Sequence, residues 1–263
     1  MALVLDSGDG TVLYEKKPKT KKPIASLTKL MTAMVIIDSS PSWEEIITIK
    51  KADRDRLRGS ASRLAFGTKL TRTDLFKIAV AGSENRATAA LGRTYPGGKK
   101  AMIKAMNDKA RKLGMNNTVF RDVSGLHSGN VSTASDLAIL VKAAYRYDLI
   151  KNVSTLKNDF VTDLRKGYKV QFVNTNRLVR NKSWEISLSK TGYIADSGHC
   201  LVMRADLAGR PVIVVLLNSW GKLTKYGDSN RIRKWLESAE RKSRDAAKAA
   251  DGTLGQTVGG EQS

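Results

Sequence analysis

Ser26 and Lys29 are a residue pair whose types and spacing suggest chemistry. The apolar run Leu30–Ile37 predicts a helix whose first turn carries Ser26. Residues three apart share a helical face, so the two side chains can form a hydrogen bond. A lysine whose pKa is lowered by burial or by a second cation can take the serine proton and make the hydroxyl a nucleophile. The free N–H groups at a helix start would favour the negative charge that develops.

The Ser-x-x-Lys spacing alone does not identify a site. An isolated pair of this kind is usually a solvated serine and lysine on a helix or loop. The start of a buried helix, together with two motifs further along the chain, favours Ser26. The same spacing recurs at Ser154/Lys157, Ser187/Lys190 and Ser219/Lys222.

The first downstream motif is Ser83-x-Asn85, in a turn that opens a predicted helix. Serine and asparagine are good helix caps, so a purely structural role is the simplest alternative. Ser128 and Asn130 repeat the spacing, but they precede a segment typical of a loop and a helix cap. We therefore prefer Ser83, which lies between two predicted helices.

The second downstream motif is Lys190-Thr191-Gly192, which occurs once, at the end of a predicted strand. It offers a cation, a hydroxyl and a glycine that lets a ligand backbone approach closely. Without the other motifs, the simplest interpretation of Lys190-Thr191-Gly192 is the end of a surface strand followed by a turn at the glycine.

The elements that must position these motifs are strands at both chain ends and helices between them. This order predicts an α/β (α+β) fold in which one antiparallel sheet is built from both ends, with the first and last helices on its faces. We expect one domain over residues 1–248, with a helical insertion over roughly 53–150, and a disordered tail over 249–263. The periodicity predicts helices over 73–81, 85–92, 98–113, 135–147 and 223–248, and strands over 2–5, 11–14, 46–49, 160–164, 168–173, 184–193, 200–205 and 212–217.

The charge balance narrows the class of partner. Lys and Arg number 46 against 25 Asp and Glu, a formal +21 that attracts polyanions such as nucleic acid, an anionic wall polymer or a membrane surface. The cations are scattered and no nucleic-acid-binding motif is present, so no nucleic-acid partner is expected. The longest apolar runs are too short for a transmembrane segment.

The cysteine and histidine content argues against several other site types, although a Ser-His-Asp triad is possible in principle. Cys200 is the one cysteine, so no intramolecular disulfide can form, and we expect it at an apolar strand position. His127 and His199 are too few and too far apart for a His-based zinc site, and neither lies in a recognisable Ser-His-Asp motif. No signal peptide is recognised, because Met1 leads directly into a strand-like run.

The trio Ser-x-x-Lys, Ser-x-Asn and Lys-Thr-Gly, in this order, is far more specific than any one of its parts. With it, the chain resembles the low-molecular-mass penicillin-binding proteins, which are serine D-Ala-D-Ala peptidases, and among them the D-alanyl-D-alanine endopeptidases. The resemblance runs from Ala2 to about Leu236 and implies a β-lactamase/transpeptidase-like fold. It is carried by residues 23–32, 81–87, 174–178 and 188–193.

The resemblance also implies a role for each motif residue. Ser26 would be the acylated nucleophile, Lys29 would take its proton, and Ser83 and Lys190 would relay a proton to the leaving amine. Asn85 would hold the peptide backbone, and Thr191 would contact the substrate carboxylate or nearby polar groups. Gly192 would let the ligand backbone approach closely. The backbone N–H groups of Tyr193 and Ser26 would together form the oxyanion hole.

The implied activity is hydrolysis of D-alanyl cross-links in peptidoglycan through an acyl-enzyme, in the periplasm, with stem peptides as substrate, β-lactams as acylating agents and no metal or cofactor. The +21 balance suits peripheral association with an anionic wall or membrane surface. A D-alanyl-D-alanine carboxypeptidase, a weak β-lactamase and a non-catalytic cell-wall binding protein of the same fold are the alternatives.

Two departures from carboxypeptidase relatives favour an endopeptidase. Tyr193 follows Lys-Thr-Gly where many of those relatives have a histidine, and little sequence follows Leu236 where they carry a β-rich domain and a membrane anchor. No glutamate starts a Glu-x-x-Leu-Asn motif, which disfavours a class A β-lactamase.

Overall fold

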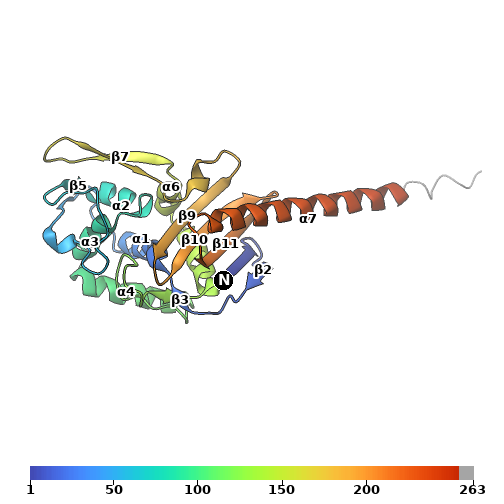
Figure 1. Cartoon of the computed structure of the whole chain (residues 1–263), viewed down its shortest axis with the longest axis horizontal. Helices are drawn as coiled ribbons and strands as arrows, with labels where there is room; N and C mark the ends of the chain where they lie inside the picture. The colour runs from blue at the N-terminus through green and yellow to red at the C-terminus, as the bar shows by residue number, and fades with distance from the viewer. Residues whose placement is uncertain (255–263) are drawn as a thin grey trace, which may run out of the picture.

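A five-stranded antiparallel sheet made from both ends of the chain organises the molecule (Figure 1). The computed structural model describes residues 1–254. In spatial order the strands are β2 (Val12–Lys16), β1 (Ala2–Asp6), β11 (Arg210–Ser219), β10 (Gly198–Leu207) and β9 (Glu185–Ile194). The first strand of the chain pairs with the last, as in the register pair Leu3–Val215. The predicted fold class is confirmed.

Helices cover both faces of the sheet. On one face α7 (Thr224–Leu254) buries Leu236 in a cluster that includes Val4 and Val214. On the other face α5 (Ala134–Ala144) contacts β1, β10 and β11. The prediction placed the first helix on a face of the sheet, but α1 (Thr28–Asp38) contacts mainly other helices. The 3₁₀ turn before it, η1 (Ala25–Leu27), contacts β9 and β10 instead.

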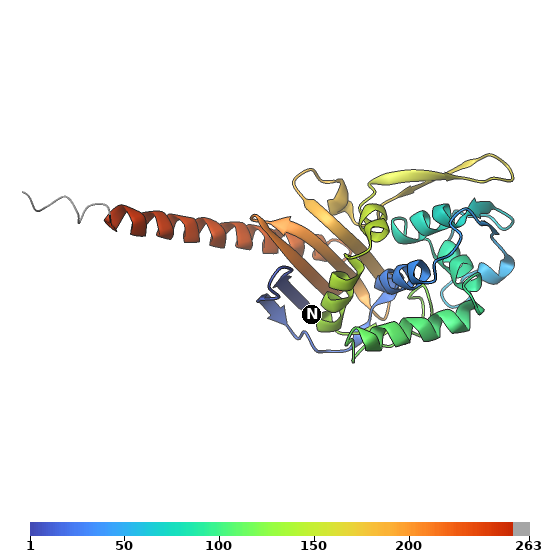
Figure 2. The ribbon, with the colours of Figure 1, turned by 180° about the vertical axis from the view of Figure 1, so that it is seen from behind.

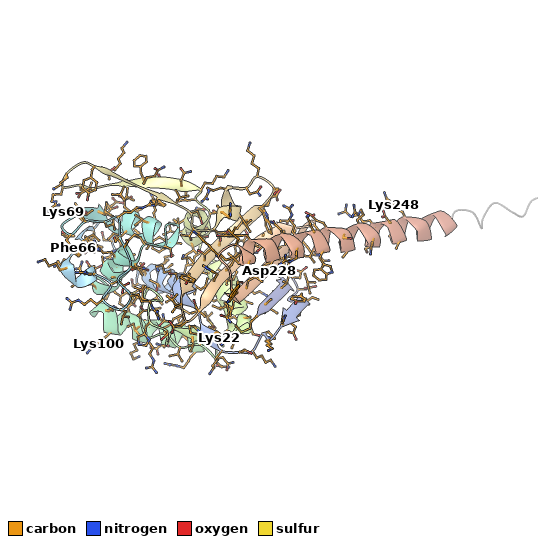
Figure 3. All side chains as sticks on the ribbon, viewed as in Figure 1. Lys22, Phe66, Lys69, Lys100, Asp228 and Lys248 are labelled. Atoms are coloured by element: carbon orange, nitrogen blue, oxygen red, sulfur yellow. The ribbon has the colours of Figure 1, made fainter. Side chains whose placement is uncertain are left out.

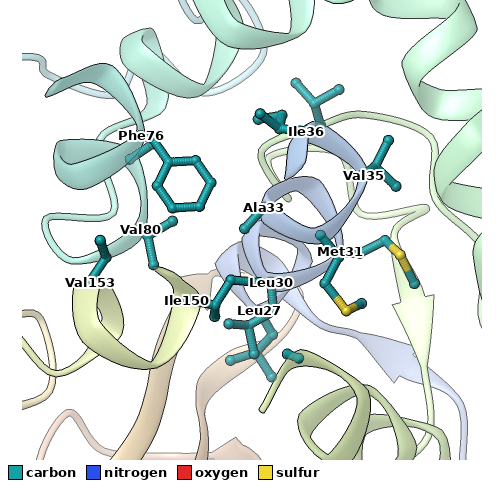
Figure 4. Packing of buried hydrophobic residues seen from close by; sticks show 14 of the residues in the cluster. Leu27, Leu30, Met31, Ala33, Val35, Ile36, Phe76, Val80, Ile150 and Val153 are labelled. Atoms are coloured by element: carbon teal, nitrogen blue, oxygen red, sulfur yellow. The ribbon is translucent and has the colours of Figure 1, made fainter. Parts of the chain in front are cut away.

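The helix α1 is buried on almost every side, which explains its nearly unbroken apolar sequence. Leu30 and its neighbours pack near Phe76 of α2 (Arg72–Val80) and Ile150 of α6 (Asp148–Ser154) (Figure 4). The sequence did not predict α6, because seven residues give too short a periodic pattern. A helix held from so many directions fixes the turn that precedes it, and with it Ser26.

The remaining elements form the helical part beside the main sheet and three small two-stranded sheets. The predicted strands near 160–164 and 168–173 pair with each other and stay outside the main sheet. Gly114 adopts a left-handed φ of 80° just after α4, as a helix stop requires. These elements are α3 (Asn85–Arg93), α4 (Gly98–Lys112), η2 (Lys51–Asp53), η3 (Arg177–Arg180) and the pairs β3 (Lys22–Pro23)/β6 (Val131–Ser132), β4 (Ile46–Thr48)/β5 (Lys69–Thr71) and β7 (Asn158–Thr162)/β8 (Lys169–Val173).

The end of α7 extends away from the rest of the protein, as both ribbon views show (Figures 1 and 2). The helix runs to Leu254 rather than to the predicted Lys248, and the rest of the predicted tail, 255–263, lies outside the described residues. Lysines lie around the body and on this extension, for example Lys22, Lys100 and Lys248 (Figure 3). Within residues 1–254, none of the helices has the length and apolar character that a bilayer crossing needs.

Candidate active site

Ser26 lies on η1, against the edge strand β9. Its neighbour Ala25 has a left-handed φ of 47°, a strained conformation for a residue with a side chain. Two glycines make room for this turn. A Cβ on Gly125 would lie 1.9 Å from the Ala25 carbonyl oxygen, and one on Gly192 would lie 2.9 Å from the Ser26 amide nitrogen. Only glycine therefore fits at the two positions that flank the serine backbone.

Lys29 makes three hydrogen bonds that converge on its ammonium nitrogen. Its Nζ lies 2.8 Å from Ser26 Oγ, 2.8 Å from Asn85 Oδ1 and 2.9 Å from the Ser124 carbonyl oxygen. The lysine is 1% exposed, whereas Ser26 is partly exposed. As a neutral amine, Lys29 would donate to the amide and the carbonyl and accept from the serine hydroxyl. The structure thus pairs a reachable hydroxyl with a buried, oriented base.

Lys190 forms a second lysine–serine pair across the site. Its Nζ donates to Ser83 Oγ at 2.9 Å and to the Thr191 carbonyl oxygen at 3.1 Å. Ser83 has a left-handed φ of 58°, so its turn is strained like that of Ala25. The Thr191 hydroxyl donates to Thr175 Oγ1 at 2.7 Å.

Burial lowers the pKa of both lysines. Desolvation lowers the pKa of Lys29 to about 8, opposed by the negative charges of Asp122, Glu84 and Asp55. Desolvation also lowers the pKa of Lys190 well below its usual value, and the nearby charge of Lys29 lowers it further. Of the two causes expected to lower a lysine pKa, burial acts on both lysines, and a second cation acts on Lys190.

Tyr193 is the last of the four predicted site residues that lie next to one another on β9. Its side chain is 58% exposed and stacks on His199 of β10, with ring centroids 4.3 Å apart. Because β9 lies at one edge of the sheet, its outer side can pair with an extended peptide. The predicted oxyanion-hole groups, the N–H groups of Ser26 and Tyr193, belong to segments that meet at Gly192.

The structure brings all eight predicted residues into one region and separates the competing motifs from it. Asn130 is fully buried and hydrogen-bonds to Thr28 and Asp122, so Ser128-x-Asn130 is structural. None of the other three Ser-x-x-Lys pairs is joined by a hydrogen bond within residues 1–248. The eight residues are Ser26, Lys29, Ser83, Asn85, Lys190, Thr191, Gly192 and Tyr193.

Sequence reasoning missed several residues that complete the site. Ser124 acts through its main-chain carbonyl, which has no sequence signature. Asp122 accepts hydrogen bonds from the Ser124 hydroxyl and from the Gly125 N–H, which holds that loop against Ser26. Ser60 accepts from Asn85 Nδ2 at 3.0 Å and so orients the amide. The Ser-Gly step at 124–125 is a turn signal that could have drawn attention to this loop.

No group of three potential metal ligands of the His, Cys, Asp or Glu type forms in the part of the chain that the structure describes. The chemistry available at this site is that of two serine hydroxyls and two lysine amines. Cys200, the residue predicted at an apolar strand position, is fully buried in β10, and burial raises the pKa of its thiol. It is not part of the site.

Comparisons with known proteins identify the family to which the chain is similar. A family model described as D-alanyl-D-alanine carboxypeptidase matches residues 1–221. The chain is 45% identical to the D-alanyl-D-alanine endopeptidase of Pseudomonas aeruginosa and 42% identical to that of Escherichia coli, in each case over 91% of this chain and 77% of the relative. Among solved structures, the Streptomyces K15 DD-transpeptidase superposes with a TM-score of 0.81 at 28% identity, over 89% of this chain and 95% of that one.

Proposed function

This chain belongs to the D-alanyl-D-alanine carboxypeptidase family of serine peptidases, and on that premise we propose that it is a DD-endopeptidase that uses Ser26 as its acylated nucleophile. The convergence of Ser26, Asn85 and the Ser124 carbonyl on Lys29 Nζ carries the assignment of the nucleophile. The two endopeptidase relatives support cleavage of cross-links rather than of chain ends. The expected place of action is the periplasm, where peptidoglycan lies.

In the acylation step, Lys29 as a neutral amine takes the proton of Ser26 while Oγ attacks the carbonyl carbon of the D-alanyl residue. The oxygen of that carbonyl becomes negative and lies between the N–H groups of Ser26 and Tyr193. Asn85 and the outer side of β9 hold the peptide, and Thr191 contacts its polar groups. The hydrogen bonds that Lys29 and Lys190 make in the free chain support a reaction with little reorganisation.

Breaking the carbon–nitrogen bond then requires a proton on the leaving amine. The Ser83 hydroxyl can give its proton to the amine while Lys190 Nζ returns one to Ser83 Oγ across their 2.9 Å hydrogen bond. The proton that Lys29 took from Ser26 replaces the one lost by this pair, so Lys29 is a neutral amine again before the next step. Water afterwards attacks the ester on Ser26, again with Lys29 as base, and releases the free acid and the serine. A β-lactam would acylate Ser26 in the same way.

Product analysis on two substrates tests the proposed activity. We expect the native chain to cut a cross-linked muropeptide dimer into monomers and to leave a pentapeptide monomer largely intact. The Lys190→Ala chain should do neither. Release of D-alanine from the pentapeptide, with the dimer untouched, would show a carboxypeptidase instead.

A further inference from the structure

A cavity of about 560 Å³ lies between α7 and the strands β1, β2 and β11. Three exposed aromatic side chains line it, those of Tyr14, Trp220 and Trp235. The side chain of Trp220 is fully exposed, although tryptophan in a folded protein usually buries most of its surface. Exposed aromatic surface that gathers in one concave place is typical of a binding site.

The polar groups of this cavity carry little net charge. Asp228, labelled in Figure 3, forms an ion pair with Arg231 one turn further along α7, and both line the cavity. Lys16 is the other charged side chain of the lining. Asn218 adds an amide that makes no side-chain hydrogen bond within residues 1–248. These donors and acceptors suit an uncharged ligand with hydroxyl and amide groups better than a polyanion.

The cavity lies at the same end of the sheet as the catalytic residues of β9. Ser219 of its lining pairs with His199 on β10, and His199 pairs with Tyr193 on β9. Since neighbouring strands are about 4.8 Å apart, the backbones of Ser219 and Tyr193 are separated by about 10 Å. The stacked rings of Tyr193 and His199 lie along this path. A ligand that runs along this end of the sheet would reach both the cavity and the catalytic residues.

We propose that this cavity binds the glycan strand of the cell-wall polymer, a chain of N-acetylated pyranose sugars. The carbon–hydrogen faces of the sugar rings would stack on the three aromatic side chains. The ion pair on α7 would bind sugar hydroxyls, and Asn218 would bind an acetamido group. The inference rests on the proposed function for the source of the glycan, because the stem peptides cleaved at Ser26 are attached to such strands.

Binding of peptide-free sugars tests this site without any need for catalysis. The probes are a tetramer of β-linked N-acetylglucosamine, the corresponding glucose tetramer, which lacks the acetamido groups, and heparin as a polyanion. By calorimetry we expect the amino-sugar tetramer to bind about tenfold more tightly than the glucose tetramer, the effect of its added amide hydrogen bonds. Its binding should also shift the tryptophan fluorescence, because exposed rings leave water.

Substitutions assign the binding to the lining residues. Trp220→Ala and Trp235→Ala should each weaken binding of the amino-sugar tetramer about tenfold, because each removes a stacked ring. Phe160→Ala is the matched control, since Phe160 is 47% exposed like Trp235 but lies on β7, outside the cavity, and it should bind like the native chain. Asn218→Asp should abolish the preference for the acetamido sugar; aspartate tolerates the left-handed φ of 55° at this position.

Undetectable binding of the amino-sugar tetramer, or equal binding of the two tetramers, would overturn the glycan site. Native-like binding by Trp220→Ala would also overturn it, as would tighter binding of heparin, which would show a general surface for polyanions. Labelling of the native chain by a fluorescent penicillin is measured alongside. A native chain that binds the tetramer as expected but resists labelling would refute the proposed acyl-enzyme and leave the glycan site standing.

Discussion

The turns at 83–85 and 128–130 share the Ser-x-Asn pattern, but their asparagines differ in burial and in hydrogen-bond partners. Asn130 is fully buried, and both ends of its amide are saturated, since it donates to Thr28 and Asp122 and accepts from the Arg121 and Asp122 N–H groups. Asn85 is only partly buried, with its oxygen on the Lys29 ammonium nitrogen and its amide nitrogen on Ser60. Asn130 holds a loop in place, whereas Asn85 orients Lys29, the proposed base.

The difference shows that the surroundings of a motif decide its use. At the first turn, strain at Ser83 turns its hydroxyl toward Lys190, beside an open cavity. At the second turn, every bond of Asn130 is to the protein's own loop and helix. Replacing Asn85 should therefore lower mainly the acylation rate, and replacing Asn130 should lower mainly the free energy of unfolding.

Asn85→Ala should produce the largest effect, a fall of about a thousandfold in the rate of acylation by a β-lactam. The substitution removes an acceptor that orients Lys29 and a contact to the ligand backbone. Unfolding free energy should fall by only about 1 kcal/mol. Stopped-flow acylation and denaturant unfolding measure the two effects, and a variant that acylates at the native rate would remove Asn85 from the site.

Asn130→Ala should instead lower the free energy of unfolding by about 3 kcal/mol, because it leaves several buried partners unsatisfied. The Asp122 carboxylate, the Thr28 hydroxyl and two backbone N–H groups lose hydrogen bonds. The fraction that stays folded should label with penicillin at close to the native rate. If a fully folded Asn130→Ala chain acylates as slowly as Asn85→Ala, the distinction between the two turns fails.

The pH dependence of the acylation rate should follow the ionisation of Lys29, which Asn85 of the first turn holds in place. With a pKa of about 8, Lys29 is mostly protonated at pH 7 and mostly neutral at pH 9, so the acylation rate should rise about tenfold between them and then level off. Glu84→Gln should move the midpoint to lower pH, because that carboxylate raises the pKa of Lys29. A rate that falls or stays flat over this range would contradict Lys29 as the base.

Ser128→Ala should give the smallest effect, since no hydrogen bond of its hydroxyl occurs in residues 1–248. We expect a change within about 0.5 kcal/mol in unfolding free energy and unchanged acylation. Ser83→Ala is the matched substitution at the first turn and should slow peptide cleavage. Equal effects of the two substitutions would show that the hydroxyl bonded to Lys190 is dispensable.

Local and sheet-level features could be predicted from the sequence. Ser26 and Lys29 lie one helical turn apart, so their contact depends only on a helix there. The sheet followed from strand patterns at both chain ends. The order of the motifs identified the long-range partner Ser83, which lies 107 residues from Lys190.

Features set by tertiary contacts could not be predicted. The Ser124 carbonyl meets Lys29 across 95 residues through a backbone atom that every residue has. The helix that packs on the face of the sheet opposite α7 proved to be α5 and not the predicted first helix. The reason is that α1 is buried on almost every side and lies among other helices.

Mass spectrometry of the penicillin adduct tests the central claim most directly. After incubation with benzylpenicillin, the intact native chain should gain the mass of one penicilloyl group, and peptide mapping should place it on Ser26. Ser26→Ala should gain nothing. An adduct on another serine, or none on a folded native chain, would contradict the assignment of Ser26 as the nucleophile.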